Sequence, residues 1–195
     1  MGARWLLLLA TGCAKNPSTA GLEASGASPH PDLVCAPTTI PAGLAPPQGS
    51  EVWCQVALPT GTYQRQGPSI AWHANEQRSA EGGWSTGKRS GSWQFWYATG
   101  EVERTGTYVN GVEDGVWVSY HPNGERAAEG QMVDGKENGE WTYWSEDGAT
   151  HTVGRWSLGL RDGTWVDYTP NETALREKVF RDGRMVSQKE LQKQP

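Results

Sequence analysis

The four histidines are the first residues to consider for catalytic chemistry, because imidazole serves as a general base and as a metal ligand. They are His30, His73, His121 and His151. His73 and His121 occupy the same position of a repeated block, just before a turn, whereas a catalytic residue is expected to be unique. No pair of a base with a nucleophile is visible. We therefore interpret the histidines as turn-flanking residues and expect no catalytic residue and no enzyme.

Acidic residues gather in the loops and raise the question of calcium binding. They are Glu113, Asp114, Asp134, Glu137, Asp147 and Asp162. Their spacing matches no calcium loop such as the EF-hand, and Asp commonly stabilises turns through its own backbone. A cysteine pair with no nearby histidine is a poor zinc site. The sequence therefore predicts neither a metal nor a cofactor. The net charge of -5, with no basic stripe, also argues against a nucleic-acid partner.

Tryptophan is the most unusual feature of the composition, with 11 in 195 residues. Aromatic side chains bury large areas and anchor interfaces, so they form either the core or a binding surface. Most fall in two rows of fixed spacing. The first aromatic row is Trp93, Trp117, Trp141 and Trp165. The second aromatic row, three residues further along each time, is Trp96, Tyr120, Trp144 and Tyr168.

Both rows belong to a block that begins with glycine and recurs every 24 residues. The block starts are Gly67, Gly91, Gly115, Gly139 and Gly163. Five copies without an insertion predict a repeat fold. Strand-prone aromatic segments alternate with Asn-Gly and Asp-Gly turns, and the glycine density excludes helix. We predict an all-β protein, an elongated single-layer antiparallel β-meander built from five hairpin repeats over residues 67–186.

The turns predict which side chains meet. If Thr99-Gly100 is a two-residue turn, Trp93 pairs with Gly106. The same count pairs Trp117 with Gly130 and Trp141 with Gly154. If Asn110-Gly111 also has two residues, Gly106 lies beside Gly115, and each ring of the first row covers a trough of two glycines.

The two aromatic rows are expected on opposite faces of the sheet, because their positions differ in parity. We interpret the first row as structural packing, since nothing else in the chain covers the sheet. The second row is the candidate binding face, able to stack on sugar rings or to hold a partner protein. A stabilising cross-strand row of aromatic residues remains the alternative.

The chain begins with a segment that resembles a bacterial lipoprotein signal. Arg4 precedes the apolar run of residues 5–10, and two small residues stand before Cys13, although Ala10 replaces the usual large apolar residue. The resemblance implies that residues 1–12 are a signal peptide and that Cys13 carries acyl chains such as palmitate. Such chains imply a membrane anchor in the bacterial cell envelope, which we expect at the outer membrane.

The remaining segments flank the repeats. Residues 13–50 are rich in Ala, Ser, Pro and Gly and predict a flexible tether. Residues 51–66 are expected to form an N-terminal capping hairpin, and residues 187–195 a disordered tail. In an oxidising compartment Cys35 and Cys54 predict a disulfide, with two free thiols as the alternative.

The repeat pattern resembles the bacterial variant of the MORN repeat, best over residues 106–115 and 139–148. The resemblance covers 67 to about 186. It implies an interaction or scaffold role, and some bacterial relatives carry an antitoxin label. We therefore expect a non-enzymatic, envelope-anchored interaction protein. Two alternatives remain open: a carbohydrate- or peptidoglycan-binding module that uses the second aromatic row, and an antitoxin-like protein.

Overall fold

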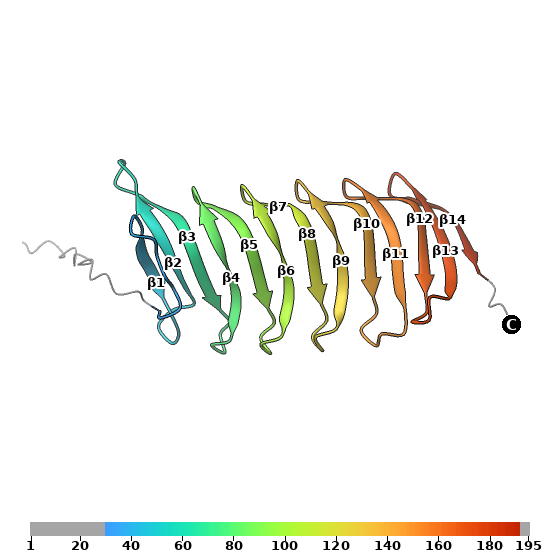
Figure 1. Ribbon diagram of the computed structural model, residues 1–195, viewed down its shortest axis with the longest axis horizontal. Helices are drawn as coiled ribbons and strands as arrows, with labels where there is room; N and C mark the ends of the chain where they lie inside the picture. Colours follow the sequence, from blue (N-terminus) through green and yellow to red (C-terminus); the bar gives the residue numbers. More distant parts are fainter. Residues whose placement is uncertain (1–29, 192–195) are drawn as a thin grey trace, which may run out of the picture.

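The described part of the molecule is one antiparallel sheet whose strands pair in chain order. The computed structural model describes residues 30–191, and Figure 1 shows the hairpins following one another along the long axis. Strand β7 pairs only with β6 and stands off this path. Within the described residues there is no helix. The predicted all-β meander is confirmed.

The strands take their bounds from the repeat. They are β1 (Ile40–Leu44), β2 (Glu51–Ala57), β3 (Tyr63–Trp72), β4 (Arg78–Ser85), β5 (Lys88–Trp96), β6 (Val102–Val109), β7 (Val112–Glu113), β8 (Gly115–Tyr120), β9 (Arg126–Val133), β10 (Lys136–Trp144), β11 (His151–Ser157), β12 (Leu160–Tyr168), β13 (Ala174–Arg181) and β14 (Arg184–Glu190).

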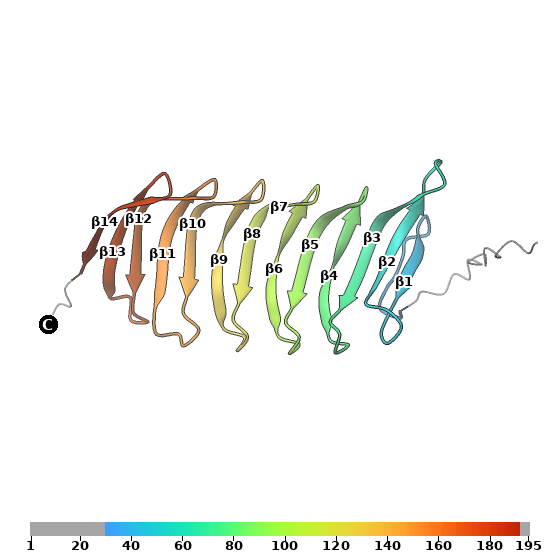
Figure 2. The same ribbon diagram turned by 180° about the vertical axis from the view of Figure 1, so that it is seen from behind.

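Two kinds of turn close the hairpins along the two long edges of the sheet, where the strands end, which Figure 2 shows from behind. At one edge Asn110 and Gly111 both have positive φ, 51° and 86°. This conformation is typical of the two-residue turn that matches the strand twist. At the other edge the turn at Thr99-Gly100 is longer than expected, because the amide of Tyr97 donates to the carbonyl of Glu101 (2.9 Å).

A β-bulge at the start of each block changes the predicted register. Gly83 pairs with Ser90 but Gly82 pairs with Trp93, so two extra residues stand on β5. Gly91 lies in this bulge with a φ of 74°, a conformation that glycine adopts without strain. The predicted trough of two glycines is therefore wrong.

The bulge leaves Trp93, Trp117 and Trp141 each between two strand glycines, whereas Trp165 has Lys178 opposite it on β13. The equivalent bulge brings Gly106 beside Trp117 instead of Gly115, since Thr105 pairs with Val118. Trp93 itself lies opposite Gly82 on one side and Gly106 on the other. Tryptophan and glycine thus alternate across the middle of the sheet.

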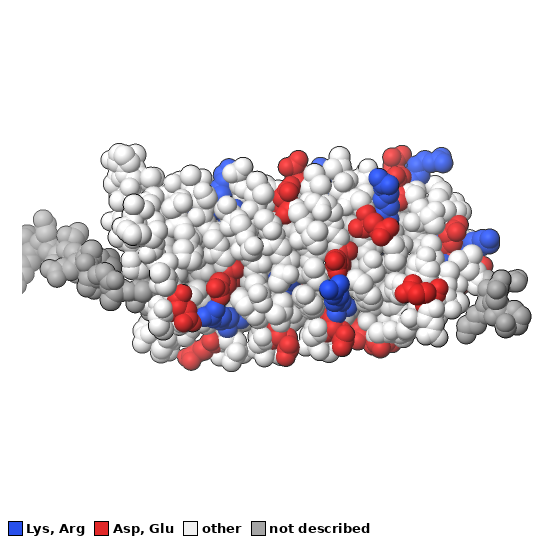
Figure 3. Space-filling model, in the orientation of Figure 1, with Lys and Arg blue, Asp and Glu red and all other residues white. Residues whose placement is uncertain are grey.

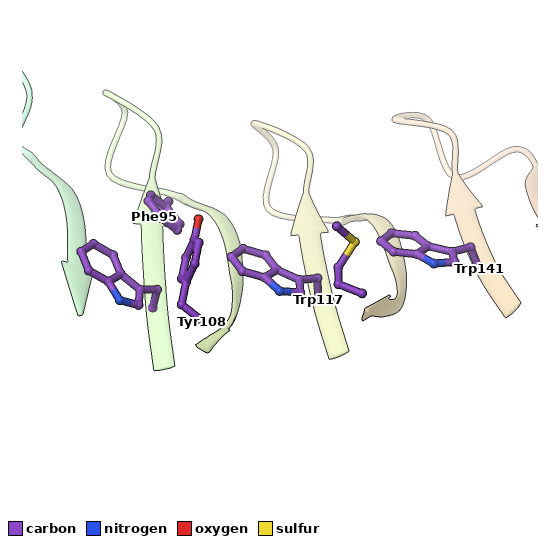
Figure 4. Close-up of a cluster of buried hydrophobic side chains, with 6 residues drawn as sticks. Phe95, Tyr108, Trp117 and Trp141 are labelled. Atoms are coloured by element: carbon purple, nitrogen blue, oxygen red, sulfur yellow. The ribbon is translucent and has the colours of Figure 1, made fainter. Parts of the chain in front are cut away.

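Each indole ring of the first row lies directly on the glycine of the preceding strand. The pairs are Gly82 with Trp93, Gly106 with Trp117, Gly130 with Trp141, and Gly154 with Trp165. A methyl group at Gly130 would lie 2.1 Å from a ring carbon of Trp141, closer than any van der Waals contact. These tryptophans are buried, and Figure 4 shows Trp117 and Trp141 in line with Phe95 and Tyr108 on one face, here called the first face. The opposite surface of the sheet is called the second face.

The C-terminal part of the predicted tether is folded from residue 30 on. Strand β1 pairs with β2 along its whole length. Leu33 is 1 % exposed and packs with Val52 and Ile70, and a disulfide joins Cys35 to Cys54. A flexible tether over 30–50 is therefore wrong, because apolar burial and the disulfide hold this segment on the sheet. The signal segment and Cys13 lie outside the described residues.

The two ends of the repeat array differ from the predicted segments. The hairpin expected at 51–66 is made by β2 and β3, but β3 continues into the first repeat and β1 adds a third strand. The disordered tail is wrong for residues 187–190. They extend β14, where Ser187 pairs with Val179 and Glu190 accepts a hydrogen bond from Arg176 (2.6 Å).

The tryptophan–glycine contact yields a testable expectation. Gly130→Ala should lower the free energy of unfolding by about 3 kcal/mol, since the new methyl group overlaps the Trp141 ring. In a Trp141→Ala background the same change should cost far less, because the methyl group then has room. Urea denaturation followed by circular dichroism measures both differences. Equal losses in the two backgrounds would contradict the contact.

Candidate functional site

The second aromatic row lies on the second face, among polar side chains. Trp96 borders an open groove of about 490 Å³ that is also lined by Ser92, Gln94, Thr105 and Thr107. These hydroxyl and amide groups alternate with the buried first-row side chains along the same strands, as the period of a strand requires. The groove is shallow and half-apolar, and such a surface suits a chain lying along it better than an enclosed small molecule.

The other members of the second row lie in different surroundings. Trp144 borders a similar groove of about 430 Å³ with Arg126, Glu129 and Thr142. Tyr120 faces a smaller hollow of about 290 Å³ between the two. Tyr168 stacks on His151 with ring centroids 5.1 Å apart. The structure thus brings three of the four predicted residues into adjoining grooves, while Tyr168 stacks on His151 of the neighbouring strand.

The chain's own N-terminal segment already occupies the second face at the first repeat. Trp72, the equivalent of Trp96 there, is 9 % exposed beneath this segment. The ring of His30 lies 5.0 Å from that of Trp72, and Asp32 forms an ion pair with Arg78. Together with the buried Leu33, these contacts show how a short segment with a turn at residues 30–33 is held on this face.

The sequence did not reveal this arrangement. The only indication in the sequence that this segment packs on the sheet was one leucine and one cysteine within a run of proline and small residues. Because Leu33 follows Asp32 on a segment with no strand pattern, its burial depends on contacts that only the folded sheet supplies. Arg78 likewise carried no sign of its partner 46 residues away.

The shared histidines connect neighbouring repeats. Nε2 of His73 donates a hydrogen bond to the main-chain carbonyl of Trp96 (2.7 Å), and Nε2 of His121 does the same to Trp144 (2.8 Å). The hydroxyl of Tyr97, at the equivalent position, donates to the carbonyl of Tyr120 (2.8 Å). These side chains fix the backbone of the second row and have a structural role. Between residues 30 and 191, no group of three or more His, Cys, Asp or Glu side chains is placed to hold a metal ion.

Arginine side chains cover much of the first face. Arg89 lies over the rings of Trp93, Phe95 and Tyr108, and Arg104 lies over Phe95 and Trp117. A cation over an aromatic face is attracted by the electron density of the ring. The first face is thus largely covered by the chain's own cations.

Burial on the first face also affects ionisation. Tyr143 is stacked between Trp141 and Trp165, and its hydroxyl accepts a hydrogen bond from Nε1 of Trp156 (2.8 Å). Desolvation raises the pKa of Tyr143 to about 12. The phenol therefore stays neutral and packs as part of the aromatic row.

Charge is dispersed over the surface. Figure 3 shows acidic and basic side chains interspersed on the face in view, with uncharged surface between them. Several of these charges form ion pairs, such as Arg126 with Glu129. In the part of the chain described by the structure, no helix is long and apolar enough to cross a membrane.

Comparison with known families supports the repeat assignment. The profile of the MORN repeat variant matches residues 89–110 and 113–134, which are two adjacent repeats of the array. Repeats of this kind are generally non-enzymatic and often serve as protein-interaction or scaffold modules. No curated protein matches the chain.

One tryptophan of the first row lacks a hydrogen bond that its equivalents make. Nε1 of Trp141 donates to the carbonyl of Gln131 (3.1 Å). The equivalent carbonyl for Trp117 is that of Thr107, which instead accepts the amide of Asp114 (3.0 Å). Nε1 of Trp117 is buried without a partner.

This difference predicts unequal costs for the same substitution. Trp141→Phe should lower the free energy of unfolding by about 1 kcal/mol more than Trp117→Phe, because only the first change removes a hydrogen bond. Urea denaturation followed by circular dichroism compares the two variants. A loss for Trp117→Phe as large as that for Trp141→Phe would show that its indole nitrogen has a partner in solution.

Proposed function

We propose that the chain is a lipid-anchored interaction protein that binds a short segment of a partner protein on its second face. The supporting observation is the chain's own segment at 30–36, which lies on that face over Trp72. The continuation of the same surface, which forms open grooves among residues 30–191, carries Trp96, Tyr120 and Trp144. A partner segment that supplies an apolar side chain and a nearby acidic one would make equivalent contacts there.

The third repeat carries the same chemistry as the first. Tyr120 pairs with Arg126 as Trp72 pairs with Arg78. The ion pair of Arg126 with Glu129 corresponds to that of Arg78 with Glu81. Since Arg78 also binds Asp32, Arg126 is the counterpart available to an acidic side chain of a partner.

A carbohydrate-binding role is the second candidate. The grooves beside Trp96 and Trp144 combine an indole with hydroxyl and amide groups, a combination suited to a sugar ring. Peptidoglycan is the glycan that an envelope protein would meet. The antitoxin-like alternative has no such supporting contact among the described residues.

The envelope location is part of the proposal. Acylation of Cys13 would hold the repeats at a membrane surface, and the outer membrane of a bacterium is the expected site. The disulfide between Cys35 and Cys54 supports an oxidising compartment, since cytosolic thiols are kept reduced. In the chain-entropy model, closing this loop stabilises the N-terminal strands by roughly 3 kcal/mol.

The binding face has a direct test. Trp96→Ser combined with Trp144→Ser should lose a partner protein that the wild type retains from envelope extract after crosslinking and washing. Leu158→Ser is the matched control, because Leu158 is an exposed residue in a hairpin turn. Circular dichroism checks that both variants fold. Equal retention of the partner by the double variant would contradict binding through the second face.

The same double variant separates the two candidate roles. If the face binds glycans, muropeptides at millimolar concentration should change the tryptophan fluorescence of the wild type and the Leu158→Ser control but not of the double variant. No change in the wild type would exclude the glycan role and leave the protein-binding role standing.

The lipid anchor is tested separately. Cys13→Ser should move the full-length protein from the membrane fraction to the soluble fraction, because the acceptor for the acyl chains is lost. Membrane fractionation with immunoblotting measures the distribution, and the wild type provides the control. A Cys13→Ser protein that stays with the membrane would rule out this anchor.

A further inference from the structure

Two repeats place their own arginine over the first-row tryptophan. Cζ of Arg89 lies 4.5 Å from the ring centroid of Trp93, and Cζ of Arg161 lies 4.5 Å from that of Trp165. In both repeats the arginine stands four residues before the tryptophan. The two contacts have the same geometry although the repeats are far apart in the sequence.

The two central repeats carry glutamate at this position. Glu113 precedes Trp117 and forms an ion pair with Arg104 (2.8 Å), whose Cζ lies 5.0 Å from the Trp117 ring. Trp117 therefore has a substitute cation. Over Trp141 no arginine or lysine lies among the described residues, and there the carboxylate of Glu137 makes neither an ion pair nor a side-chain hydrogen bond.

A small cavity opens at this place. Ring contacts run from Trp84 to Trp117 and from Trp141 to Phe180, but no ring–ring contact joins the two runs within residues 30–191. Ser119 and Met132 stand where the second repeat has Phe95 and Tyr108.

The cavity measures about 180 Å³ and is lined by Glu113, Trp117, Met132, Glu137 and Trp141 among others. It is smaller than the roughly 300–1,000 Å³ typical of small-molecule sites, so it suits a single side chain.

We propose that this cavity binds the guanidinium group of an arginine side chain supplied by a partner protein. The guanidinium would take the place over Trp141 that Arg89 and Arg161 take over their own tryptophans. Glu137 would accept two parallel hydrogen bonds from it. A carboxylate beside the electron-rich face of a ring is unfavourable by itself, and a bound cation removes that repulsion.

Arginine fits better than lysine because its planar group stacks on an indole and is weakly hydrated. Of the ionic groups that line the cavity, Arg104 and Glu113 neutralise each other, so the charge of Glu137 is left for the incoming cation. The cavity lies on the first face, away from the grooves of the second face. The inference therefore stands independently of the function proposed above.

The test uses N-acetyl-arginine amide as the probe and N-acetyl-citrulline amide as its neutral isostere. The indole N–H signal of Trp141 in the NMR spectrum, identified with Trp141→Phe, reports binding to the whole protein. We expect the arginine probe to shift this signal at millimolar concentration and citrulline to leave it unchanged. No response to arginine, or an equal response to both probes, would overturn the proposal.

Two variants of one residue make the test specific. Glu137→Gln should weaken arginine binding at least tenfold. Glu137→Arg should abolish it and raise the melting temperature, because the new side chain fills the cavity as Arg161 does in its own repeat. The control Glu140→Gln removes the same charge from the second face and should bind as the wild type does.

Other outcomes of these variants count against the proposal. Equal weakening by Glu137→Gln and Glu140→Gln would mean that only overall charge matters and would overturn the specific site. The Trp96→Ser and Trp144→Ser variant should bind the arginine probe normally, which separates failure of this site from failure of the second face.

Discussion

The contact between an indole ring and a bare strand backbone is the interaction on which the sheet depends. A single-layer sheet has no second layer to bury its apolar face, so each tryptophan of the first row must cover the sheet itself. It does so by lying flat on a glycine, where any other residue would overlap the ring. Because the glycine alone would weaken its strand, the two residues are stable only together, and the block repeats them as a pair.

The bulge glycines follow from the same constraint. A hairpin register without the bulge would place two glycines side by side, and the next tryptophan would then have no glycine opposite it on the preceding strand. The bulge at Gly91 and its equivalents shifts the pairing by two residues, so that a tryptophan meets a glycine on both of its neighbouring strands. Each bulge requires positive φ, which accounts for the glycine that begins every block. The sequence therefore repeats with the same period as this tryptophan–glycine contact and its bulge.

Sequence reasoning predicted the strands and the two aromatic rows because both depend on local pattern, and it predicted the disulfide because two cysteines in an oxidising compartment commonly pair. Parity along a strand separates the rows, and Asn-Gly turns mark the hairpins. The bulge was missed because the sequence does not distinguish a glycine that adopts positive φ in a bulge from a glycine that makes room for a neighbouring ring. The burial of Leu33 was missed for a different reason. Its partners Val52 and Ile70 lie on strands distant in the sequence, and nothing in the residues around Leu33 indicates that they meet. The sequence analysis did not predict that Arg89 covers the Trp93 ring, because this contact depends on the folded geometry of the strand.

Variation among the repeats is informative, because the tryptophan–glycine contact allows few substitutions at its own positions. The first and third repeats share a histidine that hydrogen-bonds the next repeat, and they share an arginine with its ion pair on the second face. The second repeat has Tyr97 and Val102 at the corresponding positions. On the first face the residue four positions before the tryptophan changes from arginine to glutamate in the central repeats. None of these changes touches the tryptophan–glycine pairs, so stability does not require them to differ. Repeats that share one fold in this way present different chemistry along the sheet, and a partner that lies across several repeats would contact those differences in a fixed order.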